Sequence, residues 1–175
     1  CTEILDNQSK AVDRVGNIVN SLRNFARADS DNIEIIDLNE ITNDTMALYR
    51  QRNTKRNTRR NTETEATIQK YLAPELPHFK GNIIKLQQVI MDFLSKANDA
   101  CDGKHEDQRI TIETLTEGPT VVLKITHNGA DNSQDQGIAI SHSVIQSFGG
   151  TLNIEDHQGV STSVVIKFPI LPIDV

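Results

Sequence analysis

One stretch decides the fold of this chain: residues 86–100 have the sequence Leu86-Gln87-Gln88-Val89-Ile90-Met91-Asp92-Phe93-Leu94-Ser95-Lys96-Ala97-Asn98-Asp99-Ala100. Its apolar residues recur at steps of three and four, which is the spacing of the buried stripe of an amphipathic helix. They are Leu86, Val89, Ile90, Phe93, Leu94 and Ala97. The stretch therefore predicts one helix, on which Asp92 and Lys96 share a face and can form an ion pair.

Strands and helices alternate on both sides of this helix. The patterns predict strands at residues 33–36, 67–72, 109–115, 120–126, 151–155 and 162–168, with further helices that begin at Asp37 and at Ile138. Asp37 is the predicted N-cap of the first of these helices, because an acidic residue, Glu40, follows three positions later. Helices that alternate with paired strands indicate an α+β fold, a two-layer α/β sandwich with a mixed sheet.

A separate helix is predicted at residues 4–27. Its apolar residues, Ile4, Ala11, Val15, Ile18, Leu22 and Phe25, follow the a/d pattern of a coiled coil. A single helix of this kind packs on the following domain or pairs with a second copy. We favour a homodimer through residues 4–25, and we divide the chain into a dimerisation-type helix (1–30) and one further domain (31–175).

The composition narrows the function classes. The chain has 175 residues, 37% hydrophobic, with a net charge of −6 that argues against general affinity for nucleic acid. Its two cysteines offer neither the spacing of a metal site nor a disulfide framework. No apolar run approaches the ~18 residues of a membrane span, and the first residues are polar, so we expect no membrane segment and a cytoplasmic location.

Residues 50–60 have the opposite charge from the rest of the chain. They hold six of the 18 basic residues and no acid, which leaves 12 basic against 24 acidic residues elsewhere. Residues 52–62 repeat the pattern R-N-T-x almost three times. The repeat is either a continuation of the preceding helix, with Arg52, Arg56 and Arg60 on one face, or an irregular loop, because Asn and Thr are weak helix formers.

Several motifs resemble those of sensor histidine kinases. The stretch at 86–100 is similar to the family pattern L-x-Q-V-L-x-N-L-L-x-N-A-x-x-A. The others are Leu22-Arg23-Asn24-Phe25-Ala26-Arg27, Ile36-Asp37-Leu38-Asn39, Leu76-Pro77 before Gly81, and Gly159-Val160-Ser161-Thr162 before Pro169. The resemblance implies the second helix of the dimerisation domain followed by a GHKL-type ATP-binding domain of the Bergerat fold. It also implies ATP and Mg²⁺ as ligands and a response regulator as partner.

The resemblance also assigns candidate nucleotide-binding positions. Asp92 and Lys96 stand where the family has asparagines, and Asp92 is the one candidate ligand for Mg²⁺. The family's D-x-G-x-G motif aligns with His127, Gly129 and Asp131. The end of the glycine-rich loop aligns with Gly137, and the threonine of G-x-G-T aligns with Thr162.

These positions depart from the family in their chemistry. The ammonium group of Lys96 cannot ligate a metal, and Asp131 replaces a glycine. Ser133 and Asp135 replace the glycines that would bring backbone N–H groups to phosphate. Only seven residues separate Gly129 from Gly137, where the family has a long lid over ATP.

The phosphoacceptor is also missing. The family places its phosphoacceptor histidine on the first dimerisation helix, and this chain begins on what looks like the second. Its five histidines, His78, His105, His127, His142 and His157, all follow residue 30, so no catalytic residue is assigned.

Three functions follow from these observations. We expect a histidine-kinase-like module with a degenerate nucleotide site, a pseudokinase with a structural or regulatory role. An active ATP-binding domain that phosphorylates a histidine is the alternative. A third interpretation is an interaction module, in which the basic repeat meets an acidic partner or nucleic acid.

Overall fold

The computed structural model describes residues 32–60, 66–101, 107–129 and 138–171. The chain divides into two units, residues 1–32 and 33–175, and all the described helices and strands belong to the second. The predicted helix at residues 4–27, and the dimer predicted through residues 4–25, lie outside the described residues. The predicted boundary between residues 30 and 31 stays a prediction.

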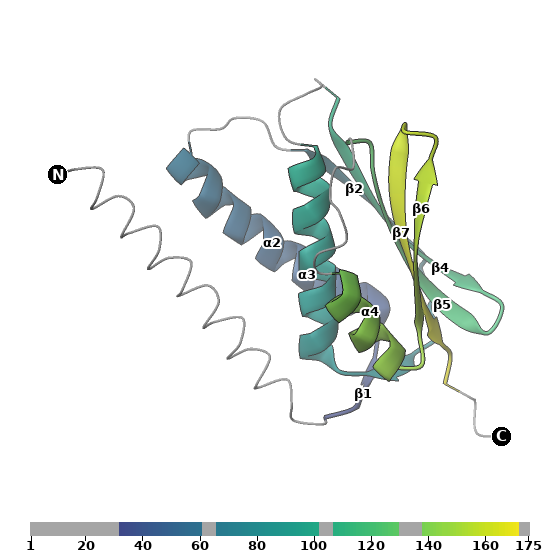
Figure 1. The fold of residues 1–175 in the computed structure, drawn as a ribbon. Coiled ribbons are helices and arrows are strands. Elements are labelled where there is room, and N and C mark those ends of the chain that lie inside the picture. The colour runs from purple at the N-terminus through teal and green to yellow at the C-terminus, as the bar shows by residue number, and fades with distance from the viewer. Residues whose placement is uncertain (1–31, 61–65, 102–106, 130–137, 172–175) are drawn as a thin grey trace. The chain divides into compact units, whose positions relative to one another are not determined.

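The second unit has two layers, with three helices against one face of a sheet (Figure 1). Its elements are β1 (Glu34–Ile36), α2 (Leu38–Arg60), β2 (Thr67–Leu72), β3 (Phe79–Gly81), α3 (Ile83–Ala100), β4 (Arg109–Glu117), β5 (Thr120–His127), α4 (Ile138–Ser147), β6 (Thr151–His157) and β7 (Ser161–Pro169). The main sheet has the strand order β2-β4-β5-β7-β6, and β1 pairs with β3 in a separate two-stranded sheet. Strand β2 is parallel to β4 and the other neighbours are antiparallel. The predicted two-layer sandwich with a mixed sheet is confirmed.

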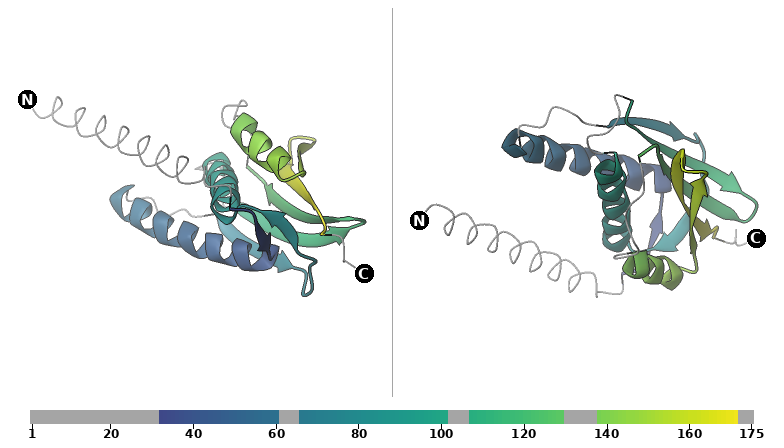
Figure 2. Two further views of the ribbon diagram at one scale, coloured as in Figure 1. Left: turned by 90° about the horizontal axis from the view of Figure 1, so that it is seen from below. Right: turned by 45° about the horizontal axis from the view of Figure 1, so that its top comes forward.

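Helix α3 forms because its apolar stripe is buried as the sequence predicts. All six apolar residues of the stripe are buried, and Leu86, Ile90 and Leu94 are fully so. Asn82 caps the first turn, since its Oδ1 accepts a hydrogen bond from the backbone N–H of Lys85 at 3.0 Å. Figure 2 shows α3 on one side of the main sheet, and its buried residues belong to the same apolar core as those of β5.

The helix-facing side of the sheet follows from strand alternation. In β5 the buried residues Val121, Leu123, Ile125 and His127 point to this side. Phe79 of β3 and Phe168 of β7 stack with ring centroids 4.2 Å apart. His127 is the last residue of β5 and the one polar member of this buried series, so it lies at the end of the apolar core.

Helix α2 continues through the basic repeat as far as Arg60. It begins as predicted, because Asp37 Oδ1 accepts hydrogen bonds from the backbone N–H groups of Asn39 (2.9 Å) and Glu40 (3.3 Å). Of the two predicted alternatives, the helical one is correct for residues 52–60. Glu40 near the first turn and arginines near the last also match the helix macrodipole.

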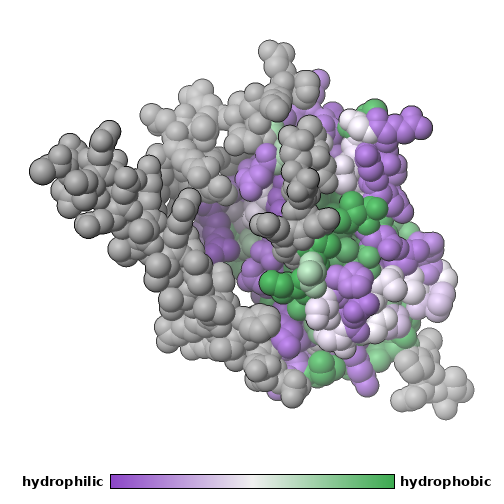
Figure 3. Space-filling model, in the orientation of Figure 1, coloured by the Kyte–Doolittle hydropathy of each residue, from purple (hydrophilic) through white to green (hydrophobic). Residues whose placement is uncertain are grey.

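Strand β3 was not predicted by the sequence pattern. It has only three residues and pairs with the equally short β1, so it is too brief to produce an alternation. Among the described helices none is long and apolar enough to cross a membrane. Figure 3 shows apolar surface around α4, where Ile140 is 62% exposed.

Candidate functional site

A narrow pocket lies between α3 and the helix-facing side of the sheet. Its described lining is Phe93, Lys96, Ala97, Ile125, His127, Ile138, Ile154, Thr162 and Val164. The pocket has a volume of about 30 Å³. That is room for a water molecule or two, because one water needs about 10–15 Å³ on the same measure.

His127 and Thr162 form the polar end of the narrow pocket. They are register partners on β5 and β7, and their exposed fractions are 7% and 6%. Side chains alternate between the two faces of a strand. His127 lies two residues after Ile125, and Thr162 lies two residues before Val164, so both side chains are on the helix-facing side. The structure thus brings together two residues that lie 35 positions apart in the sequence.

Lys96 enters the narrow pocket from α3. Its ammonium nitrogen lies 5.7 Å from the ring centroid of Phe93, a cation–π distance. Lys96 therefore contributes a cationic side chain to the pocket lining, at the position where the resemblance expects a magnesium ligand.

Asp92 is half-buried on α3 and is not among the residues that line the narrow pocket. Its Oδ1 accepts a hydrogen bond from Gln88 Nε2 at 3.0 Å. Burial raises the pKa of the Asp92 carboxyl group, and the Gln88 bond and the charges of Lys96 and Arg52 oppose that rise. Asp92 and Lys96, which could pair on one helix face, are not among the ion pairs within 4 Å of the described residues, and Lys96 acts on Asp92 at longer range.

Gly129 follows His127 by two residues and packs against the end of α3, and we call this contact the rim. A Cβ atom added there would overlap the carbonyl oxygen of Ala100 and would lie 2.7 Å from the backbone nitrogen of Cys101. The position accepts only glycine because two backbone segments meet here. The structural reason for this glycine is therefore close packing of the backbone.

Asn128 holds this rim together, and sequence reasoning assigned it no role. Its Oδ1 accepts the backbone N–H of Arg109 at 2.8 Å, and its Nδ2 donates to the carbonyl of Asp107. The buried Cys101 thiol donates to the same Oδ1 at 3.8 Å, and burial raises the pKa of that thiol. Its position directly after a buried strand was the available signal.

The structure therefore places the predicted site residues in three groups. Lys96, His127 and Thr162 meet in the narrow pocket, Gly129 lies at the rim, and Asp92 lies outside the pocket. Asp131 and Gly137 lie outside the described residues.

The described residues of the narrow pocket do not fit a magnesium nucleotide. Pockets for small ligands have volumes of ~300–1,000 Å³, against about 30 Å³ here. Magnesium requires oxygen ligands, usually carboxylates and phosphates, and the pocket presents the ammonium group of Lys96 instead. The carboxylate of Asp92, on the same helix as Lys96, accepts a hydrogen bond from Gln88 and does not line the pocket.

A second polar group on the opposite side of the sheet does not form a hydrolytic site. Ser163 Oγ lies 3.1 Å from His157 Nε2 and 2.8 Å from Thr126 Oγ1, and Glu155 Oε2 lies 3.9 Å from the same Nε2. A catalytic triad needs serine and carboxylate on opposite ring nitrogens. Ser163 is also fully buried, so this cluster joins β5, β6 and β7 and offers no exposed nucleophile.

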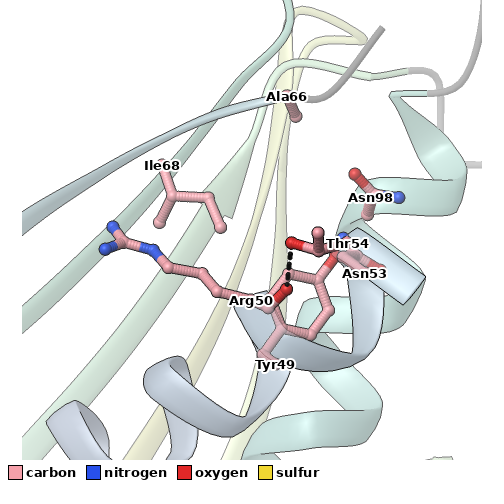
Figure 4. Close-up of a pocket in the computed structure, with 7 residues that line it drawn as sticks. All are labelled: Tyr49, Arg50, Asn53, Thr54, Ala66, Ile68 and Asn98. Carbon is pink, nitrogen blue, oxygen red and sulfur yellow. Dashed lines mark hydrogen bonds between the residues drawn. The ribbon is translucent and has the colours of Figure 1, made fainter. Parts of the chain in front are cut away.

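A larger cleft lies where α2, β2 and the end of α3 meet, and we call it the amide cleft (Figure 4). Its volume is about 290 Å³, and its lining residues are Tyr49, Arg50, Asn53, Thr54, Ala66, Ile68 and Asn98. Thr54 Oγ1 donates to the carbonyl of Arg50 at 2.9 Å, which ties its side chain to the helix backbone. Sequence reasoning missed this cleft, because its walls come from three separate elements.

Comparison with known proteins bears out the resemblance. No family model matches the sequence. Among curated proteins, the chain is 25% identical over 181 aligned residues to the C4-dicarboxylate transport sensor protein DctB of Rhizobium meliloti, covering 93% of this chain and 28% of that protein. It is 22% identical to Sporulation kinase B of Bacillus subtilis, covering 95% of this chain and 43% of that protein. The chain thus spans less than half the length of these relatives.

Solved structures agree with the curated relatives. Histidine kinase AdeS of Acinetobacter baumannii superposes with a TM-score of 0.66 at 16% identity, over 91% of this chain and 80% of that chain. The chain has the fold of a histidine kinase catalytic domain. The catalytic domain of histidine kinase ThkA gives a TM-score of 0.63 at 15% identity, over 81% of this chain and 99% of that one. Histidine kinase ThkA in complex with response regulator protein TrrA gives 0.66 at 15% identity, over 95% of this chain and 50% of that one.

Proposed function

We propose that the chain is the histidine-kinase-like catalytic-domain module of a two-component signalling protein, with a nucleotide site too degenerate to bind ATP. Its role is then structural or regulatory. The fold and the curated relatives support the first part of the proposal. The narrow pocket supports the second, and the observation that carries it is the cationic side chain of Lys96, which lines the same pocket of about 30 Å³ as His127.

The charge of Lys96 and the small volume of the narrow pocket both disfavour binding of a magnesium nucleotide. A like charge a few ångströms from a divalent cation is repulsive, and the repulsion is strongest where little solvent intervenes. His127 also stands where the family has the aspartate that bonds the adenine amino group, and it lines this pocket together with Phe93. The site therefore opposes both ends of a magnesium nucleotide.

Thermal unfolding with and without nucleotide tests this proposal. A ligand that binds the native state raises the unfolding midpoint by mass action. We expect no change in the midpoint with Mg-ATP at millimolar concentration, with an active histidine kinase catalytic domain measured in parallel. A rise that requires magnesium would contradict the proposal and favour the alternative, an active ATP-binding domain.

The proposed module acts as a homodimer through residues 4–25. The support is the apolar a/d seam of that segment, since a free seam would leave a long apolar stripe in water. Ile18→Asp should give a monomer by light scattering, while circular dichroism shows the α+β unit still folded. A wild-type chain that is already monomeric at tens of micromolar would contradict this part of the proposal.

A response regulator is the proposed partner, and the cytoplasm is the proposed location. The support is the likeness to ThkA, whose structure was solved with response regulator TrrA. The partner and the location both rest on the resemblance to two-component proteins.

A further inference from the structure

We propose that the amide cleft binds an acidic peptide segment in extended conformation. Asn53 and Asn98 would hold one peptide group of the segment, and the basic half of α2 would attract its carboxylates. This site is separate from the narrow pocket and needs no nucleotide.

Asn53 is the first observation. Its exposed fraction is 9%, it lines the cleft, and its side-chain amide has no hydrogen-bond partner among the described residues. The side chain as a whole is buried, but its amide atoms reach the solvent of the cleft. A ligand that enters the cleft of about 290 Å³ can therefore pair with this amide in place of water.

Asn98 is the second observation. It lines the cleft from α3, and its side-chain amide also has no partner among the described residues. In Figure 4 the Asn98 side chain stands on the α3 side of the same space that Thr54 and Ile68 border. Two free carboxamides from different helices thus face one cleft.

The chemistry of carboxamides favours a peptide over a simple anion. Each carboxamide has an N–H donor and a carbonyl acceptor, and a peptide group offers the matching acceptor and donor. Sulfate only accepts hydrogen bonds, and inorganic phosphate at neutral pH presents mostly acceptor oxygens, so either one matches two carboxamides less well than a peptide group does.

A nucleobase has donors and acceptors too, but the cleft lacks the surface that bases use. Recognition of single bases relies on exposed aromatic faces for stacking. Tyr49 is the single aromatic residue of the described lining, and its exposed fraction is 3%. The walls at Ala66 and Ile68 are aliphatic, which suits a peptide side chain.

The charge around the cleft selects an acidic segment. None of the described residues that line it is acidic, and Arg50 is exposed at its edge. Five more basic residues follow in the second half of α2, between positions 52 and 60. A positive potential of this kind raises the rate of encounter with acidic partners.

Strand β2 limits how the peptide lies. β2 is an edge strand of the main sheet, paired only with β4. Farther along the strand, Lys70 Nζ donates to Asn43 on α2 at 2.9 Å, and a lysine on an edge strand disfavours pairing with a new strand. The segment therefore sits at the Ala66–Ile68 end and does not extend the sheet along all of β2.

Fluorescence anisotropy tests the proposal with a short labelled peptide in which glutamate alternates with valine. We expect saturable binding to the full chain without nucleotide. Asn53→Leu and Asn98→Leu should each weaken binding about tenfold, the loss of one well-made interaction. Gln51→Leu, on the same helix but outside the lining, should bind like wild type. Arg50→Gln should weaken binding and lower its dependence on salt.

Competitors separate the peptide from other ligands. A peptide with glutamine in place of glutamate should bind more weakly, and AMP and inorganic phosphate should not displace the acidic peptide. Displacement by AMP or by phosphate, or no saturable binding of the peptide at low salt, would overturn the proposal. So would full binding by Asn53→Leu and Asn98→Leu alongside weak binding by Arg50→Gln, because surface charge alone would then be responsible.

Unfolding of the same variants checks that the fold survives. Asn53→Leu replaces a partnerless amide by an apolar group of similar size, so its unfolding midpoint should equal or exceed that of wild type. If Asn53→Leu does not fold, then Asn98→Leu, which is less buried, decides the outcome against Gln51→Leu.

Discussion

Helix α3 contributes to two hollows of different character. On one side, Phe93, Lys96 and Ala97 help to close the narrow pocket of about 30 Å³, which is lined by positions that resemble histidine kinase motifs. On the other side, Asn98 borders the amide cleft of about 290 Å³, where no motif of that family was found. The side chains that line the narrow pocket leave little free volume, whereas those that line the amide cleft leave room for a ligand.

The difference shows that fold and site depend on different residues of one helix. The apolar stripe at 86–97 matches the family and packs as expected, so the scaffold is kept. Asp92 and Lys96 lie between the stripe positions, where a change of side chain costs little packing. A helix can therefore keep its place in the core while the sites on its two sides change independently.

The largest effect is expected at the rim. Gly129→Ala should lower the free energy of unfolding by about 3 kcal/mol, because its Cβ would overlap backbone that cannot move cheaply. Gly118→Ala is the matched control. Gly118 has φ +57° but nothing within 4 Å of an added Cβ, so we expect about 1 kcal/mol from backbone strain alone. Urea unfolding measures both, and equal losses would show that the rim is not tightly packed.

A smaller effect is expected beside the amide cleft. Changing Arg52, Arg56 and Arg60 together to Gln should change the free energy of unfolding by less than about 1 kcal/mol, the scale of surface substitutions. The reason is that the repeat contributes no apolar residue to the core, and like charges four apart repel weakly. Chemical denaturation, with circular dichroism to follow helix content, provides the measurement. A loss of several kcal/mol would mean that these arginines are paired with acidic groups of the fold.

The smallest effect is expected at Asp92. Burial raises the folded-state pKa above the ordinary value of 3.8, so the folded state favours the protonated carboxyl group. Its contribution to stability is complete below the unfolded-state pKa and is lost as pH rises through the folded-state pKa. Asp92→Asn should then stabilise the protein at pH 7 by less than about 0.5 kcal/mol, because solvent screens a half-buried group.

Unfolding at several pH values checks this prediction for Asp92. The gain from Asp92→Asn should shrink as pH falls toward 4. A gain that is the same at all pH values would show that ionisation of Asp92 is not its cause.

The sequence predicted the elements whose pattern is local. The stripe at 86–97, the N-cap at Asp37 and the alternation of β5 each follow from neighbours a few residues away. Strand β3 escaped because three residues give no period. The amide cleft escaped because Asn53, Ala66 and Asn98 meet only after three elements pack, and no spacing along the chain encodes that meeting. His127 and Thr162 were grouped beforehand only through the family motifs.

The parallel pairing of β2 with β4 also has a consequence for the order of folding. Strands β4 and β5 are joined by a turn at Gly118-Pro119 and can form a hairpin by local search. Thr67 of β2 pairs instead with Arg109 of β4, and β3 and α3 lie between them in the chain. Closing that long loop is slow compared with a hairpin. The edge that borders the amide cleft should therefore be among the last parts to assemble and the first to open, and its amide protons should exchange with solvent sooner than those of β5.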